Sequence, residues 1–166
     1  RQQLPGDGAL PVVLAGDIGH TPPPRLIHHA YHGLGCAEKD VPLQWDELGK
    51  PSVEKDGVYV SVSHSGPWAV CVTADAPVGV DVEVVRSAQE KFMRRVCSEQ
   101  EMAYIRFGND GDCQRFWEIW TAKEALFKLT GKGPLLALSR FSLPAGVTLD
   151  YTAQKGCALT IAAQIL

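Results

Sequence analysis

Apolar positions along this chain follow two spacings, and each spacing predicts a different kind of element. Runs that alternate, or that are rich in β-branched residues, predict short strands. These runs span residues 10–15, 41–45, 58–62, 68–73, 78–85, 140–143, 147–151 and 158–165. Positions that repeat at helical spacing predict helices over 25–35, 87–107 and 112–129. Short strands that flank two or three helices indicate the α+β class.

Capping and turn residues set the ends of these elements. Glu101 follows Ser98 by three residues, as in a capping box, which predicts a break within 87–107. Gly131 is typical of the residue that ends a helix, here the one over 112–129. The segment Ser63-His64-Ser65-Gly66-Pro67 separates two apolar runs, and we interpret it as a polar turn.

Two carboxylates lie on the strand predicted at 78–85, within Gly79-Val80-Asp81-Val82-Glu83. Side chains alternate across a strand, so Asp81 and Glu83 share one face while the valines face the core. Adjacent carboxylates repel each other, and a hard divalent cation with oxygen ligands would remove that repulsion. The plainer alternative is a strand face exposed to water.

The longest predicted helix places an acid and a base on one stripe with two large aromatic residues. At helical spacing Trp117, Trp120, Glu124 and Lys128 fall along this stripe. The tryptophans are typical core residues. Glu124 and Lys128 form either an exposed i,i+4 ion pair or a site beside the strand carboxylates, with Glu124 as ligand or base and Lys128 near a phosphate.

Other polar residues suit phosphate binding, although each has a plainer interpretation. Ser63 and His64 offer a hydroxyl and an imidazole at a strand end, but a histidine in a turn is more often simply exposed. Lys50 lies in the turn Gly49-Lys50-Pro51. Lys132 lies between two glycines, but the remainder of a P-loop is missing there.

Composition narrows the classes of function. The 166 residues are 45% hydrophobic and carry a net charge of −3, which argues against bulk nucleic-acid binding. No apolar run approaches the roughly 20 residues of a membrane span, and no secretion leader precedes the first strand. The five cysteines include no CxxC pair, which predicts reduced thiols in a cytoplasmic protein.

Four motifs together resemble one known family. They are Gly49-Lys50-Pro51, Ser63-His64-Ser65, Gly79-Val80-Asp81-Val82-Glu83 and Trp120-x-x-Lys123-Glu124-Ala125-x-x-Lys128-x-x-Gly131-x-Gly133. In this order they resemble the 4′-phosphopantetheinyl transferases, of the larger kind that serves non-ribosomal peptide and polyketide synthesis. The resemblance spans about residues 41–143. It implies two similar α+β halves, here 1–76 and 77–166, packed as a pseudo-dimer with a shortened first half.

The resemblance also implies an activity and a site. The activity is Mg²⁺-dependent transfer of the 4′-phosphopantetheine arm of coenzyme A to a serine of an acyl or peptidyl carrier protein, with release of 3′,5′-ADP. It makes the chain a holo-[acyl-carrier-protein] synthase, in which Mn²⁺ is a possible replacement. The implied metal ligands are Asp81, Glu83 and Glu124, and Glu124 is also the base. The implied phosphate ligands are Lys50, Ser63, His64, Lys123 and Lys128.

The chain departs from the family in its first half. Only 48 residues precede the Gly49-Lys50-Pro51 turn, and they are rich in glycine and proline. Arg25 and His28 lie near the position of a family arginine, out of register with it, and are candidates to replace it. A neighbouring chain would be a second way to complete the half. The first residue, Arg1, fits either a trimmed chain or a domain taken from a larger synthase.

An acidic carrier protein would need a local basic surface. Four basic residues follow the carboxylate strand closely enough to supply one: Arg86, Lys91, Arg94 and Arg95. The apolar residues Phe92, Met93 and Val96 lie in the same segment and belong either to the contact or to the core. The alternative for the basic residues is an ordinary solvated helix face.

Two other functions fit some of the same residues. A non-catalytic module would bind coenzyme A or a carrier without turnover. A metal-dependent phosphoester hydrolase would use the same three acids and release phosphate without a carrier. A transferase, in contrast, releases 3′,5′-ADP only when the carrier is present.

Overall fold

The computed structural model describes residues 12–15, 43–45, 47, 51–53, 57–107, 113–131, 143–154 and 156–165. Within these segments six strands come first, three helices follow them, and two further strands come last. The strands are β1 (Val12–Ala15), β2 (Leu43–Trp45), β3 (Pro51–Val53), β4 (Tyr59–Ser65), β5 (Trp68–Ala74), β6 (Val78–Val84), β7 (Val147–Gln154) and β8 (Cys157–Gln164). The helices are α2 (Glu90–Val96), α3 (Glu99–Phe107) and α4 (Gln114–Thr130).

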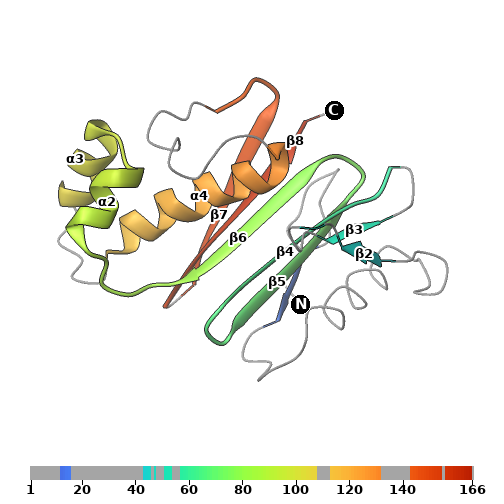
Figure 1. Ribbon diagram of the computed structural model, residues 1–166, viewed down its shortest axis with the longest axis horizontal. Coiled ribbons are helices and arrows are strands. Elements are labelled where there is room, and N and C mark those ends of the chain that lie inside the picture. Colours follow the sequence, from blue (N-terminus) through green and yellow to red (C-terminus); the bar gives the residue numbers. More distant parts are fainter. Residues whose placement is uncertain are drawn as a thin grey trace.

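The strands form two three-stranded antiparallel sheets and one two-stranded ribbon. The first sheet has the order β1-β5-β4 and the second the order β6-β8-β7, while β2 pairs with β3. Figure 1 shows α4 lying across the second sheet, with α2 and α3 grouped at the N-terminal end of α4. The mixture of antiparallel sheets and helices confirms the predicted α+β class.

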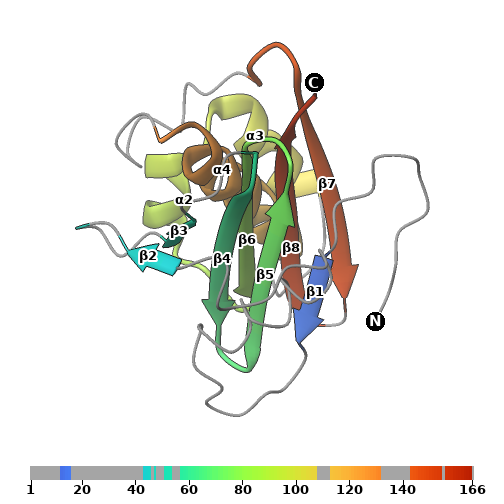
Figure 2. The same ribbon diagram turned by 90° about the vertical axis from the view of Figure 1, so that its right-hand side faces the viewer.

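The main core lies between the two sheets. Alternate residues of β5, β6 and β8 form it, among them Val70, Val72, Val80 and Val82, which are almost wholly buried. Because side chains alternate across β6, burying Val80 and Val82 on this face places Asp81 on the other. Figure 1 shows β6 between α4 and the first sheet, and in the turned view β4 and β5 lie in front of β6 and β8 (Figure 2).

Helix α4 covers the other face of the second sheet. Ala125 and Leu126 pack with Ala162 of β8, and the buried hydroxyls of Thr121 and Thr160 lie 2.8 Å apart. Small residues at this contact let the helix approach the sheet closely. The carboxylate face of β6 is therefore the face that α4 covers.

The predicted break within 87–107 and the predicted helix end at Gly131 are confirmed, whereas α2 and α4 begin at Glu90 and Gln114, three and two residues later than predicted. The segment 87–107 divides into α2 and α3, and Ser98 and Glu101 form the reciprocal hydrogen bonds of a capping box, 2.7 and 3.2 Å long. Helix α4 ends at Gly131, which has a φ of 63°. The left-handed conformation favours glycine at this position.

One predicted turn is wrong. Ser63, His64 and Ser65 form the last part of β4, and the turn to β5 is at Gly66 and Pro67. Strand β4 continues to Ser65 because its serines occupy every second position, so that all three of their hydroxyls reach a partner on β6. Polarity alone suggested a turn, whereas the two-residue spacing is that of a strand.

Several predictions fall partly or wholly outside the described residues. They include the helix over 25–35, the Gly49-Lys50-Pro51 turn apart from Pro51, the strand at 140–143 and Lys132. Of the helices that the structure describes, none is long and apolar enough to cross a membrane. The four described cysteines, Cys71, Cys97, Cys113 and Cys157, are free thiols.

Candidate active site

A glycine brings α4 against β6. A Cβ atom added at Gly79 would overlap the carbonyl oxygen of Ala125 and lie 2.6 Å from the amide nitrogen of Leu129. Contact this close between a strand and a helix requires a residue without a side chain. The glycine therefore lets Glu124 and Lys128 of α4 approach the carboxylates that follow it on β6.

Asp81 is the most enclosed of the three predicted acids. Its side chain is buried, and its Oδ1 atom accepts hydrogen bonds from the Ser63 hydroxyl at 2.7 Å and the Lys128 ammonium at 2.8 Å. Burial raises the pKa of Asp81, while the charge and hydrogen bond of Lys128 act in the opposite direction. Its Oδ2 atom is buried and has no hydrogen-bonding partner among the described residues.

The other two predicted acids are Glu83, which accepts a hydrogen bond from β4, and Glu124, whose pKa responds to the charges around it. The Ser65 hydroxyl donates to Oε2 of Glu83 at 2.6 Å. The pKa of Glu124 is raised to about 7, mainly by burial and also by the charges of Asp81 and Glu83, while Lys128 acts in the opposite direction. The charges of both strand carboxylates therefore act on Glu124.

The donor atoms suit a hard divalent cation. Three carboxylates repel one another here, and the partnerless Oδ2 of Asp81 is an oxygen that a cation would satisfy. As the described residues are placed, no group of three His, Cys, Asp or Glu side chains is close enough together to hold a metal ion. The donors fit Mg²⁺ in kind and in charge, and Asp81, Glu83 and Glu124 are the residues that would hold it.

The two predicted lysines of α4 point in different directions. Lys128 reaches β6, where it donates to Asp81 and, at 2.9 Å, to the carbonyl oxygen of Val80. Lys123 is buried and donates to the carbonyl oxygen of Val96 at 2.6 Å and to Glu101 at 2.7 Å. The structure thus gives Lys123 different partners from the phosphate predicted above, because its ammonium lies against α2 and α3.

The remaining predicted phosphate ligands have three different surroundings. His64 is exposed at the end of β4. Ser63 is buried, and its hydroxyl donates a hydrogen bond to Asp81. Lys50 lies outside the described residues.

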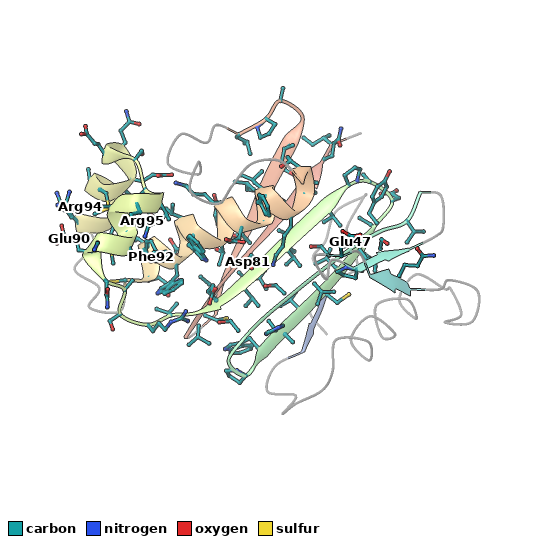
Figure 3. The ribbon with its side chains drawn as sticks, in the orientation of Figure 1. Glu47, Asp81, Glu90, Phe92, Arg94 and Arg95 are labelled. Carbon is teal, nitrogen blue, oxygen red and sulfur yellow. The ribbon has the colours of Figure 1, made fainter. Side chains whose placement is uncertain are left out.

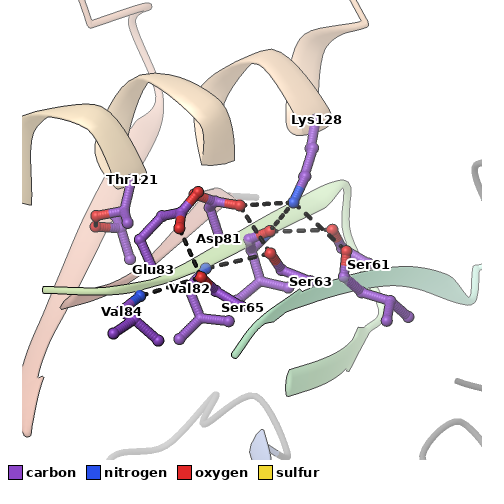
Figure 4. Close-up of polar contacts among 12 residues, drawn as sticks. Ser61, Ser63, Ser65, Asp81, Val82, Glu83, Val84, Thr121 and Lys128 are labelled. Carbon is purple, nitrogen blue, oxygen red and sulfur yellow. Dashed lines mark hydrogen bonds and ion pairs between the residues drawn. The ribbon is translucent and has the colours of Figure 1, made fainter. Parts of the chain in front are cut away.

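Sequence reasoning missed one member of the site, Ser65, and also a neighbouring serine, Ser61, that contacts none of the three acids. Ser65 holds Glu83, and Ser61 accepts a hydrogen bond from the amide of Val80 at 3.0 Å. Figure 4 shows the three serines of β4 facing β6, with Lys128 reaching down from α4. The signal in the sequence was the regular spacing of Ser61, Ser63 and Ser65, which was hidden by the interpretation of this segment as a turn.

Comparison with known proteins decides the family. The model of the 4′-phosphopantetheinyl transferase superfamily matches residues 77–160, which contain β6, all three described helices, β7 and the first half of β8. The chain belongs to this superfamily. The match includes all three acids and Lys128, so the site on β6 and α4 lies within the part that the family shares.

Relatives named in the same way include proteins of several bacilli. The chain is 32% identical to 4′-phosphopantetheinyl transferase psf-1 of Bacillus pumilus over 121 residues, which are 70% of this chain and 52% of the relative. It is 29% identical to the transferase Sfp of Bacillus subtilis over 64% of this chain and 48% of the relative. It is 29% identical to the transferase gsp of Aneurinibacillus migulanus over 65% of this chain and 46% of the relative. The chain thus spans about half the length of these curated relatives.

Proposed function

We propose that this chain transfers the 4′-phosphopantetheine arm of coenzyme A to a serine hydroxyl of an acyl or peptidyl carrier protein, with Mg²⁺ as cofactor. The observation that carries the proposal is that the charges of Asp81, Glu83 and Lys128 act on Glu124 and that Lys128 bonds Asp81. All four residues lie within the part of the chain that matches the superfamily. We propose in addition that the carrier proteins belong to non-ribosomal peptide or polyketide synthesis.

In the proposed reaction the serine oxygen of the carrier forms a bond to the β-phosphorus of coenzyme A. The bond from that phosphorus to the bridging oxygen breaks, and 3′,5′-ADP leaves with the electron pair. Glu124 takes the serine proton. A carboxylate whose pKa is raised to about 7 is a stronger base than an ordinary glutamate and is still ionised in part at neutral pH.

Charge stabilisation is the second requirement. A bound Mg²⁺ would supply positive charge beside the pyrophosphate. Lys128 adds a cation on the same side of β6, and we propose His64 and Lys50 as further phosphate ligands. We leave Lys123 out of this set, because two oxygen atoms already accept hydrogen bonds from its buried ammonium.

The coenzyme would lie where the two sheets adjoin. We propose that the sheets β1-β5-β4 and β6-β8-β7 belong to the two halves of a pseudo-dimer and that coenzyme A binds between those halves. Support comes from the site itself, because Ser63 of β4 and Asp81 of β6 are in contact across the boundary.

The carrier would dock beside α2. Figure 3 shows Arg94 and Arg95 with Phe92 on this helix, at the same end of the molecule as Glu90. Glu90 pairs with Arg94 at 2.6 Å, so part of the positive charge is balanced locally. Of the predicted apolar residues, Met93 and Val96 are buried in the core, whereas Phe92 is 37% exposed.

Another predicted docking residue, Arg86, is held against Trp117 of α4. Its guanidinium lies over the ring of Trp117, 4.3 Å from the ring centroid. The indole N–H of Trp117 donates to the carbonyl oxygen of Arg86 at 2.7 Å. The basic surface that remains for an acidic helix therefore centres on Lys91 and Arg95, which are exposed.

Intact-mass spectrometry of an apo carrier protein tests the proposal. Incubated with this chain, coenzyme A and Mg²⁺, the carrier should gain the mass of one phosphopantetheine arm, and EDTA should prevent the gain. Phosphate release without a carrier would support a hydrolase. Coenzyme A binding without any gain, tested with several carriers, would support a non-catalytic module.

A further inference from the structure

The two sheets are joined by a row of serine hydroxyls. Ser61, Ser63 and Ser65 of β4 accept hydrogen bonds from the backbone amides of Val80, Val82 and Val84 of β6, at 3.0, 3.2 and 3.1 Å. We call these three residues the serine row. Because serine and amide numbers rise together, β4 and β6 run in the same direction, with side chains taking the place of backbone carbonyls.

A hydroxyl that accepts a bond from an amide still has its own proton to donate. Ser63 donates that proton to Asp81 at 2.7 Å, and Ser65 donates to Glu83 at 2.6 Å (Figure 4). Each of these serines therefore fixes a backbone amide of β6 and the carboxylate that precedes it. With both functions of the hydroxyl used, its orientation is defined.

The first member of the row differs in one respect. Asp81 lies 18 residues after Ser63 and Glu83 lies 18 after Ser65. The same offset from Ser61 leads to Gly79, which has no carboxylate. Ser61 thus makes the bond to the sheet alone, while Ser63 and Ser65 make this bond and also hold an acid.

We propose that Ser63 and Ser65 are positioning residues that hold Asp81 and Glu83 as metal ligands. This inference rests on the proposed function. It assigns Ser63 to the acid and not to a phosphate of coenzyme A. A donor to Oδ1 of Asp81 restricts the rotation of the carboxylate and leaves Oδ2, which has no partner among the described residues, available to a cation.

Three variants separate positioning from stability. Ser61→Ala removes one bond between the sheets, and Ser63→Ala removes a similar bond together with the donor to Asp81. Ser63→Thr keeps the hydroxyl. For each full chain, the melting temperature in EDTA measures folding, and the affinity for Mn²⁺ alone, followed by electron paramagnetic resonance, measures the metal site.

We expect both alanine variants to lower the melting temperature similarly. Ser63→Ala should also weaken Mn²⁺ binding by about 10- to 100-fold, the usual effect of removing a hydrogen-bonding partner of a metal ligand. Ser61→Ala should leave Mn²⁺ affinity within about twofold of the unchanged chain, and Ser63→Thr should restore most of it. Equal Mn²⁺ affinities for the two alanine variants would overturn the positioning role.

The same measurement separates this inference from the proposed function. If the unchanged chain transfers the arm and binds Mn²⁺, but Ser63→Ala binds it equally well, only the positioning role fails. If the unchanged chain binds no Mn²⁺, the metal assignment fails and the positioning role fails with it. At saturating metal, Ser63→Ala should recover most of kcat with an unchanged KM for coenzyme A, whereas loss of a phosphate ligand would raise KM.

Discussion

The α-carbon of Gly79 faces the backbone of Ala125 so closely that no side chain fits between them. This contact sets the distance from the carboxylate strand to the helix that carries Glu124. The metal site we propose therefore depends on a residue with no functional group of its own.

Gly79→Ala should destabilise the protein by about 1–3 kcal/mol or more, because backbone atoms of α4 cannot yield as a flexible side chain would. It should also weaken Mn²⁺ binding, since the carboxylates of β6 and α4 would be separated. Denaturant titration and Mn²⁺ affinity measure the two effects.

Gly146→Ala is the matched control. Gly146 has a φ of 75° and open space around its Cβ position, so this change costs only backbone strain, about 1–2 kcal/mol. It should not affect Mn²⁺ affinity. Equal loss of affinity in both variants would show that the helix-to-strand distance is not what matters.

Lys123→Met should lower the free energy of unfolding by about 1–3 kcal/mol, because the buried ammonium bonds Val96 and Glu101 and so ties α4 to α2 and α3. The KM for coenzyme A should change little. Lys91→Met, a change at an exposed lysine, should leave stability within about 0.5 kcal/mol. A stable Lys123→Met variant with a strongly raised KM would instead favour the phosphate contact predicted from the sequence.

Asp81→Asn should abolish metal-dependent transfer while the protein stays folded. Burial raises the pKa of Asp81, so the carboxylate is held against a desolvation cost that the neutral amide lacks. In EDTA at neutral pH we expect a melting temperature equal to or above that of the unchanged chain. Transfer activity close to normal would remove Asp81 from the metal site.

Glu124 should make the metal-free protein less stable as pH rises. Its pKa is raised from 4.5 to about 7, so between these values the folded state holds a proton that the unfolded state has lost. The unfolded state binds fewer protons there, and the free energy of unfolding consequently falls with increasing pH.

Glu124→Gln, compared with the unchanged chain by denaturant titration in EDTA, should lack that part of the pH dependence. The two stabilities should diverge as pH rises from about 4.5 to about 7, with the glutamine variant the more stable at the upper end. The variant should also lose turnover while it retains coenzyme A binding. Parallel pH profiles would mean that Glu124 titrates normally.

The positions of the acids could be predicted from the sequence because that prediction needs only the spacing of neighbouring residues. Alternation along one strand put Asp81 and Glu83 on one face, and helical spacing put Lys128 one turn after Glu124. Both rules concern neighbours in the chain. The capping box at Ser98 and the helix end at Gly131 were likewise local, and the structure confirms both.

The partners of each polar group depended on contacts between distant segments. Lys123 and Lys128 are five residues apart, so at about 100° per residue they point about 140° apart on the helix. The sequence does not say which of them faces β6. Similarly, the partner of Ser63 is set by the packing of β4 beside β6, which no short-range spacing reveals.

The hydrogen bonds of the serine row are more easily lost by mutation of β4 than by mutation of β6. On the β6 side the donors are backbone amides, which every residue except proline supplies. On the β4 side the acceptors are three side chains, and each disappears with a single codon change. Substitutions that remove these hydrogen bonds should therefore fall on one strand only: in a deep mutational scan the three serines of β4 would be intolerant for this reason, whereas intolerance at Val80 and Val82 would reflect their burial in the core.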